Sequence, residues 1–270
     1  MDDRRCVEFL QWALPRLGMR WPGFRKVRGQ VCKRLRRRLG ELGLADLDAY
    51  REFLEGHPDE WARLESLTHI TISRFLRDRG MFDFLLAEVA PALAARALAR
   101  GGECVRAWSV GCASGEEAYS LSIVWRLGLD TPVRLRILAT DVDETMLERA
   151  RRGRYSAGSL RELPSAWRDA AFVRRDGEFC VREAFREAVS ISRHDIGRDP
   201  APGGGFDLVL CRNLVFTYFD SDRQQVVVTR LAEALGAGGA LVLGRHDMLP
   251  AGVGASFEDW SAAARVYRRC

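Results

Sequence analysis

The chain has 270 residues, of which 47% are hydrophobic, and a formal net charge of +5 at pH 7. It is long enough for one large or two modest domains, and no apolar stretch reaches the roughly 18 residues that span a bilayer. The seven cysteines include no C-x-x-C pair and the four histidines show no ligand spacing, so we expect no disulfide framework, no metal site and a cytoplasmic location in a reducing compartment.

The positive charge is concentrated near the N-terminus. Residues 1–40 hold 12 Lys and Arg against 3 Asp and Glu, so the remainder of the chain is slightly negative. From Arg25 to Arg38 apolar side chains recur at helical spacing and basic ones cover the other faces, which predicts a basic amphipathic helix. Such a face is a solvated surface, a nucleic-acid or membrane contact, or a docking face for an acidic protein. Nucleic acid is disfavoured because no aromatic residues that could stack on bases lie among these arginines.

Two domains are predicted from the order of the elements. Residues 1–78 show only helical patterns, whereas residues 79–270 alternate helices with apolar strands, which is typical of a doubly wound, mostly parallel α/β sheet. In the second domain we expect helices over residues 80–100, 116–127, 144–151 and 222–235, and strands over residues 105–110, 135–139, 206–211 and 240–243. Asp176 and Gly177 predict a hairpin. We assign residues 172–192 to a small β subdomain.

The most informative motif is the block WSVGCASGEEAYS at residues 108–120. Its first strand enters a turn at Gly111 and then a helix, and Asp141 ends the next strand, where an acid accepts hydrogen bonds from ribose hydroxyls. Glu116 and Glu117 at the helix start would repel the pyrophosphate of a dinucleotide, but a cationic cofactor would tolerate them. The pattern therefore favours S-adenosylmethionine over NAD.

Further motifs follow in a characteristic order: ISRFLRD at residues 72–78, ATDVD at 139–143, ARRGRY at 150–155, CRN at 211–213 and YFD at 218–220. With these motifs the sequence resembles the CheR-type chemoreceptor methyltransferases. These protein-glutamate O-methyltransferases transfer a methyl group from S-adenosylmethionine to receptor glutamates. The resemblance implies an N-terminal helical domain followed by a Rossmann-like class I methyltransferase domain, and a chemotaxis function.

The resemblance also implies roles for individual residues. The cofactor-binding positions are Thr71, Ser73, Arg77, Gly111, Glu117, Asp141, Asp195, Ile196, Arg212 and Asn213. Glu117 matches the acid at the amino-acid part of the cofactor, and Asp141 the acid at its ribose. Arg77 matches an arginine beside the transferred methyl group, and Tyr218 an aromatic residue near the reaction. We therefore list Arg77 and Tyr218 as catalytic candidates.

The sequence departs from the family pattern in two places that bear on the methyl acceptor. One extra residue separates Asn213 from Tyr218, which leaves the position of Tyr218 relative to the strand open. Gly244 is followed by Arg245, His246 and Asp247, where the family commonly has Gly-His-Ser-Glu. The acceptor is a receptor glutamate, with the helix from Arg25 to Arg38 as docking face, or else another protein or a small carboxylic acid. A sensor or scaffold that binds the cofactor without turnover is a third interpretation, and the oligomeric state stays open.

Overall fold

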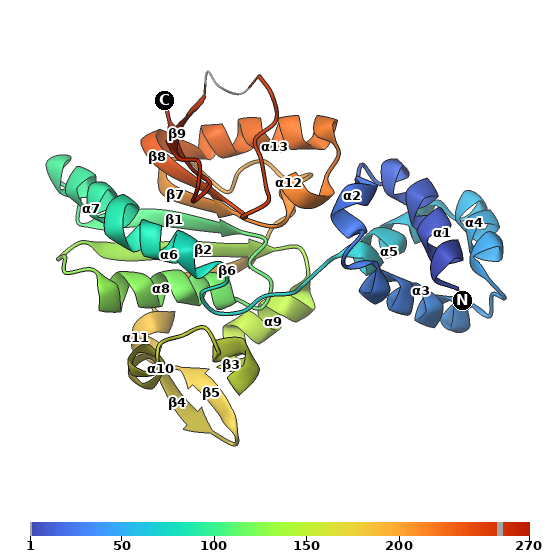
Figure 1. Cartoon of the computed structure of the whole chain (residues 1–270), viewed down its shortest axis with the longest axis horizontal. Helices are drawn as coiled ribbons and strands as arrows, with labels where there is room; N and C mark the ends of the chain where they lie inside the picture. Colours follow the sequence, from blue (N-terminus) through green and yellow to red (C-terminus); the bar gives the residue numbers. More distant parts are fainter. Residues whose placement is uncertain (1, 253–255) are drawn as a thin grey trace. The chain divides into compact units, whose positions relative to one another are not determined.

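The structure is a computed structural model that describes residues 2–252 and 256–270. Met1, in the first expected domain, and residues 253–255, in the second, lie outside the described part. The chain forms two compact units (Figure 1): a helical unit of residues 2–70 and 215–224, and a sheet unit built from the remaining described residues. The division falls after Ile70 and not after Asp78, where we expected it. The reason is that the backbone amides of Phe75 and Leu76 donate hydrogen bonds to the Ser159 carbonyl and the Ser120 hydroxyl of the sheet unit.

The helical unit follows the apolar pattern of its sequence. Its helices are α1 (Asp3–Arg16), α2 (Trp21–Phe24), α3 (Arg28–Leu42), α4 (Leu47–Gly56), α5 (Pro58–Thr68) and the short α12 (Val215–Tyr218). Val31, Leu35 and Leu39 bury one face of α3, as the helical spacing predicts. The helix ends because Gly43 adopts the left-handed conformation, at φ 67°. The basic helix therefore exists, but it starts at Arg28, later than expected.

Residues 215–224 are bound tightly to the rest of the helical unit. The backbone amide of Arg20 donates to the carbonyl of Tyr218 at 2.8 Å, and its guanidinium donates to the carbonyls of Phe216 and Thr217. Asp220 donates its amide to the carbonyl of Gly18 at 3.0 Å. These bonds satisfy the last carbonyls of α12. A segment that follows the sheet unit's motif at residues 211–213 thus completes the helical unit.

A buried polar cluster holds α3, α4 and α5 together. The Arg38 guanidinium contacts the Glu60 carboxylate at 2.7 Å, and the Tyr50 hydroxyl donates to the same carboxylate at 2.7 Å. Arg38 lowers the pKa of the Glu60 carboxyl, whereas burial raises the pKa of the Tyr50 hydroxyl. One arginine of the basic helix therefore has a structural role inside the unit.

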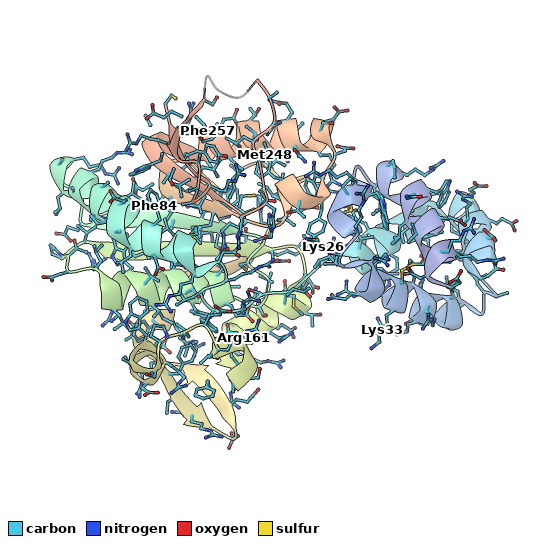
Figure 2. The ribbon with its side chains drawn as sticks, in the orientation of Figure 1. Lys26, Lys33, Phe84, Arg161, Met248 and Phe257 are labelled. Carbon is cyan, nitrogen blue, oxygen red and sulfur yellow. A yellow bond between two sulfur atoms is a disulfide. The ribbon has the colours of Figure 1, made fainter. Side chains whose placement is uncertain are left out.

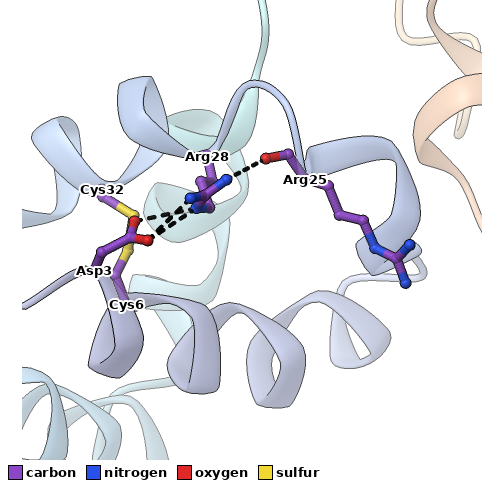
Figure 3. Close-up of a disulfide and its surroundings, with 5 residues drawn as sticks. All are labelled: Asp3, Cys6, Arg25, Arg28 and Cys32. Atoms are coloured by element: carbon purple, nitrogen blue, oxygen red, sulfur yellow. Dashed lines mark hydrogen bonds and ion pairs between the residues drawn. A yellow bond between two sulfur atoms is a disulfide. The ribbon is translucent and has the colours of Figure 1, made fainter.

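Cys6 of α1 and Cys32 of α3 form a disulfide (Figure 3). The expectation of a chain without disulfides is wrong for this pair. Their Cα atoms lie 6.0 Å apart although 26 positions separate them in the sequence, because both cysteines occupy the buried faces where the two helices pack. Beside the bridge Arg28 pairs with Asp3 at 3.0 Å, and it also donates to the carbonyl of Arg25.

The sheet unit is built on seven strands in the order β6-β2-β1-β7-β8-β10-β9. The strands are β1 (Cys104–Val110), β2 (Arg134–Asp141), β6 (Val189–Arg193), β7 (Phe206–Cys211), β8 (Leu235–Leu243), β9 (Phe257–Ser261) and β10 (Val266–Arg269). The first five in spatial order are parallel, and β10 runs antiparallel to both of its neighbours. The strand order reverses between β1 and β7, and ligands bind at such a switch point, beyond the carboxyl ends of the strands.

A second, three-stranded sheet has the order β3-β5-β4. Its strands are β3 (Arg154–Tyr155), β4 (Phe172–Arg175) and β5 (Glu178–Val181), so the expected hairpin is present. The expected range of 172–192 needs correction at its end. Residues 189–193 form β6, which pairs with β2 in the large sheet because Val189 and Ile191 lie in register beside Ile137 and Ala139.

Helices flank the large sheet in the order that the alternating pattern predicts (Figure 1). They are α6 (Arg79–Phe84), α7 (Ala90–Ala99), α8 (Glu116–Gly128), α9 (Glu144–Arg152) and α13 (Ser221–Ala234). The short helices α10 (Ser165–Ala171) and α11 (Glu183–Arg186) and a 3₁₀ turn at Ala157–Leu160 were not expected, and they belong to the segment that carries the three-stranded sheet. A π-helical turn, Leu85–Val89, joins α6 to α7 within the expected helix 80–100. Across the described residues, every helix is too short or too polar to cross a membrane.

We expect Glu60→Gln to lower the free energy of unfolding by about 2 kcal/mol at pH 7, because it leaves Tyr50 without a charged acceptor and Arg38 with Glu41 as its remaining carboxylate partner among the described residues. The pKa of Glu60 is lowered in the fold, so its contribution is complete above the ordinary glutamate pKa of about 4.3 and is lost as the pH falls from there through the lowered value. The difference from the wild type should therefore shrink in acid. Urea unfolding at pH 7 and pH 4 measures it. Glu55→Gln, at an exposed position of α4, is the control, and an equal loss in both variants would contradict the prediction.

Candidate cofactor and active site

The turn after β1 has a backbone that requires glycine at two positions. Gly111 and Gly115 have φ values of +69° and +89°, and a Cβ atom would lie 2.5 Å from Leu214 at the first and 2.9 Å from Ala150 at the second. The turn is tied to β2 because Cys112 donates its amide to the carbonyl of Thr140 at 2.9 Å. This local geometry explains the glycines in the motif.

Asp141 ends β2 and binds the turn directly. Its Oδ2 accepts a hydrogen bond from the amide of Ala113 at 2.8 Å, and its Oδ1 accepts one from the amide of Asp143 at 2.9 Å. The side chain is only partly buried, and a carboxylate oxygen can accept more than one hydrogen bond. It can thus fix the turn and bind hydroxyl groups of a ribose.

The adjacent glutamates at the start of α8 have different environments. Glu116 is 2% exposed, accepts from the Ser114 hydroxyl at 2.9 Å and has a pKa raised by burial. Glu117 is partly exposed; it accepts from the Ser109 hydroxyl at 2.7 Å and pairs with Arg212 at 3.0 Å. Of these two residues, Glu117 is therefore the one that is partly open to a ligand, and the electrostatic role expected for Glu116 stays a prediction.

Arg212, at the end of β7, connects three segments of the sheet unit. Its guanidinium pairs with Asp78 at 2.7 Å and with Glu117, and it donates to the carbonyl of Arg77 at 2.9 Å. The side chain is 2% exposed, and within the described residues its Nε has no hydrogen-bond partner. Sequence reasoning missed Asp78, although it closes the 72–78 motif.

A pocket of about 490 Å³ opens next to this network. Three of the predicted site residues line it: Ser73, Arg77 and Asn213. The rest of its lining consists of Ile72, Arg74, Asp78, Ser156, Gly158, Ser159, Arg161, Arg245 and His246. Four arginines therefore surround the space where a second substrate could meet the cofactor.

Asp247 supports this pocket and was not predicted as a site residue. Its Oδ2 accepts hydrogen bonds from the amides of Asn213 at 2.7 Å and of Gly244 at 3.0 Å. Asn213 adopts the left-handed conformation, at φ 53°, and Asp247 is 1% exposed. The acid thus fixes the loop after β7 to the loop after β8. The sequence signal that could have identified Asp247 is its position: it stands where the Glu of the family's Gly-His-Ser-Glu run is expected.

The remaining predicted residues are placed as follows. Asp195 and Ile196 come directly after His194, whose amide donates to the carbonyl of Asp141 at 3.1 Å, so both lie beside the end of β2. Thr71 opens the segment that carries Ser73. Tyr218 lies in α12 of the helical unit, with its ring 4.9 Å from that of Phe24. Its catalytic role stays a prediction.

The hydrogen-bonding groups of the site fit S-adenosylmethionine. Asp141, at the end of β2, provides acceptors for ribose hydroxyls. Glu117, in the first turn of α8, provides an acceptor for the ammonium group of the cofactor. The buried Arg212 Nε offers an unused donor among the described residues. Together with the sheet topology, these features define a Rossmann-like, S-adenosylmethionine-dependent methyltransferase.

Comparison with known proteins identifies the family. The family model described as "CheR methyltransferase, SAM binding domain" matches residues 71–265, and "CheR methyltransferase, all-alpha domain" matches residues 26–67. The chain therefore belongs to the CheR methyltransferase family. This confirms the family, the fold class and the cofactor that the motifs predicted.

Several relatives are about one third identical to this chain over the residues that align. A chemotaxis protein methyltransferase of Listeria innocua is 34% identical over 68% of this chain and 68% of its own length. The chemotaxis protein methyltransferase of Escherichia coli is 34% identical over 82% of this chain and 76% of its own. An uncharacterized 104.1 kDa protein of Rhodobacter capsulatus is also 34% identical over 82% of this chain, but the match spans only 23% of that protein.

The adjacent glutamates provide a matched test of the site. We expect Glu117→Gln to weaken S-adenosylmethionine binding at least 10-fold, because it removes a charged acceptor and leaves Arg212 underpaired. Glu116→Gln should change the dissociation constant less than threefold, since its carboxyl faces the protein interior. Isothermal titration calorimetry measures both, and thermal unfolding shows whether each variant is folded. Equal losses in the two variants would exclude the distinct roles.

Proposed function

We propose that this protein transfers the methyl group of S-adenosylmethionine to glutamate side chains on the cytoplasmic helices of a chemoreceptor. The observation that carries the proposal is the pocket in which Arg77 and Asn213 meet, directly beside the Arg212–Glu117 pair. It offers an anionic acceptor a positively charged space next to the cofactor-binding residues. Two of the three relatives named above are chemotaxis protein methyltransferases, which favours a receptor over a small carboxylic acid.

The reaction does not require the protein to remove a proton from the methyl acceptor. A glutamate side chain, with an ordinary pKa of about 4.3, is already ionised at neutral pH, so no general base is required. The bound cofactor supplies an electrophilic methyl group on a sulfonium. A carboxylate and a sulfonium become a neutral ester and a neutral thioether, so a site with little water favours the transition state, and alignment supplies much of the remainder.

Arg77 is suited to alignment. Its Nη1 donates to the carbonyl of Ile72 at 2.8 Å, so one side of the guanidinium is held by the protein. The other side can hold an incoming carboxylate or the cofactor carboxylate. A bidentate grip on the attacking carboxylate would reduce its reactivity, and the bond to Ile72 limits that grip.

Methyl esters are distinguished from other products by their sensitivity to base. With labelled S-adenosylmethionine and receptor cytoplasmic fragments, we expect label that mild alkali releases as methanol. Label that survives alkali would show an N-methyl product and would refute the glutamate proposal.

In the same assay Arg77→Ala should lower turnover at least 100-fold with a much smaller loss of cofactor affinity, because alignment is lost. Equal losses would exclude this division.

The basic helix supports a more restricted docking surface than its sequence indicates. Several of its basic side chains bind within the helical unit: Arg28 to Asp3, Arg38 to Glu60, Arg34 to the carbonyls of Leu67 and His69, and Arg37 to Glu41 on the same helix. The exposed basic residues are Arg25, Lys26, Lys33, Arg36 and Arg37. We refer to these five as the docking surface, and Lys26 and Lys33 are labelled in Figure 2. An acidic helical receptor is the complementary partner.

Charge reversal tests this surface. We expect the double variant Lys26→Glu, Lys33→Glu to raise the KM for the receptor fragment at least fivefold, because it replaces attraction by repulsion. The dissociation constant of S-adenosylmethionine should stay within twofold. The matched control is Arg4→Glu, Arg63→Glu, which reverses two exposed charges elsewhere in the helical unit. A receptor KM unchanged in the first variant, or insensitive to salt, would assign these lysines to ordinary solvated surface.

A further inference from the structure

The pocket carries more positive charge than a single carboxylate acceptor requires. Arg74, Arg77, Arg161 and Arg245 line it, and among the described residues Asp78 is its one lining carboxylate. Asp78 is itself paired with the buried Arg212 at 2.7 Å. The excess therefore lies on the arginines that face the opening.

Nearby carboxylates neutralise only part of this charge. Glu162 lies 3.4 Å from Arg74 and 3.7 Å from Arg161, so one carboxylate serves two guanidinium groups. Glu117 pairs with Arg212. The four lining arginines and Arg212 thus face three carboxylates, which leaves two positive charges. S-adenosylmethionine adds one more, since its sulfonium and ammonium outweigh its carboxylate. One acceptor glutamate would leave this space strongly positive.

The arginines come from separate parts of the chain. Arg74 and Arg77 lie in the segment before α6, Arg161 follows the 3₁₀ turn at Ala157–Leu160, and Arg245 lies after β8. Arg161 is labelled in Figure 2, and both Arg161 and Arg245 are exposed. The backbone that presents Arg245 is held by the bond from Gly244 to the buried Asp247. The backbone position of Arg245 is therefore fixed beside the pocket.

We propose that Arg161 and Arg245 form a specificity subsite for a second carboxylate of the methyl acceptor, within one helical turn of the glutamate that is methylated. The inference rests on the proposed function. Arg77 faces the reacting carboxylate, whereas Arg161 and Arg245 bind the neighbouring one at the rim of the pocket. The preferred substrate is a locally dianionic stretch of helix.

Synthetic helical peptides provide the test. One peptide carries a single glutamate among glutamines, and companion peptides add a second glutamate one, three or four positions away. We expect kcat/KM for alkali-labile methylation to be about fivefold higher for the best companion than for the single-glutamate peptide, the effect of about one partly exposed ion pair. Raising the salt concentration should reduce this preference.

The double variant Arg161→Gln, Arg245→Gln should reduce the preference to less than twofold, where the preference is the ratio of kcat/KM for the companion peptide to kcat/KM for the single-glutamate peptide, both measured with the same variant. Arg136→Gln, at an exposed arginine of β2 outside the pocket lining, should keep the full preference. Cofactor binding measured by calorimetry should be unchanged in both variants. A preference that survives in the double variant overturns the subsite.

The outcomes separate the subsite from the underlying function. Equal methylation of single- and double-glutamate peptides by the wild type would overturn the subsite and leave the methyl-ester chemistry intact. Absence of alkali-labile label on every peptide and on receptor fragments would overturn the proposed function, and the subsite with it.

Discussion

The cofactor site depends on the buried guanidinium of Arg212. It binds Asp78 from the segment before α6 and Glu117 from α8, while its own backbone continues β7. Burying this charge is costly unless its partners are in place, so the three segments must come together for any of them to be stable. Arg77 and Asn213 are neighbours of residues in this network, and their positions follow from it.

Much of the fold was accessible from the sequence because it rests on local signals. The turn at Gly111, the acid at Asp141 and the alternation of apolar strands with helices all depend on residues close together in the chain. The family motifs added the cofactor site, and Ser73, Arg77 and Asn213 do share one pocket. Asp78 and Asp247 were missed because their roles depend on partners 134 and 34 positions away.

The errors have the same physical origin. Arg34 and Arg38 look like members of a uniform basic face, but long side chains can reach inward, and here they bind carbonyls and a buried carboxylate. Cys6 and Cys32 have no meaningful spacing until two helices pack. Residues 189–193 pair with β2, which lies about 50 positions earlier in the chain, so their assignment to the large sheet depends on a contact that local sequence patterns do not reveal.

The segment of residues 215–224 has a consequence for how the protein can be divided. The carbonyls of Phe216, Thr217 and Tyr218 bind Arg20, although this stretch lies between two parts of the sheet unit in the sequence. A fragment cut after Ile70 would lack α12, and the complementary fragment would carry a hydrogen-bonding segment with no partner. Expression of the two units as separate proteins therefore requires grafting residues 215–224 onto the first and closing the resulting gap in the second.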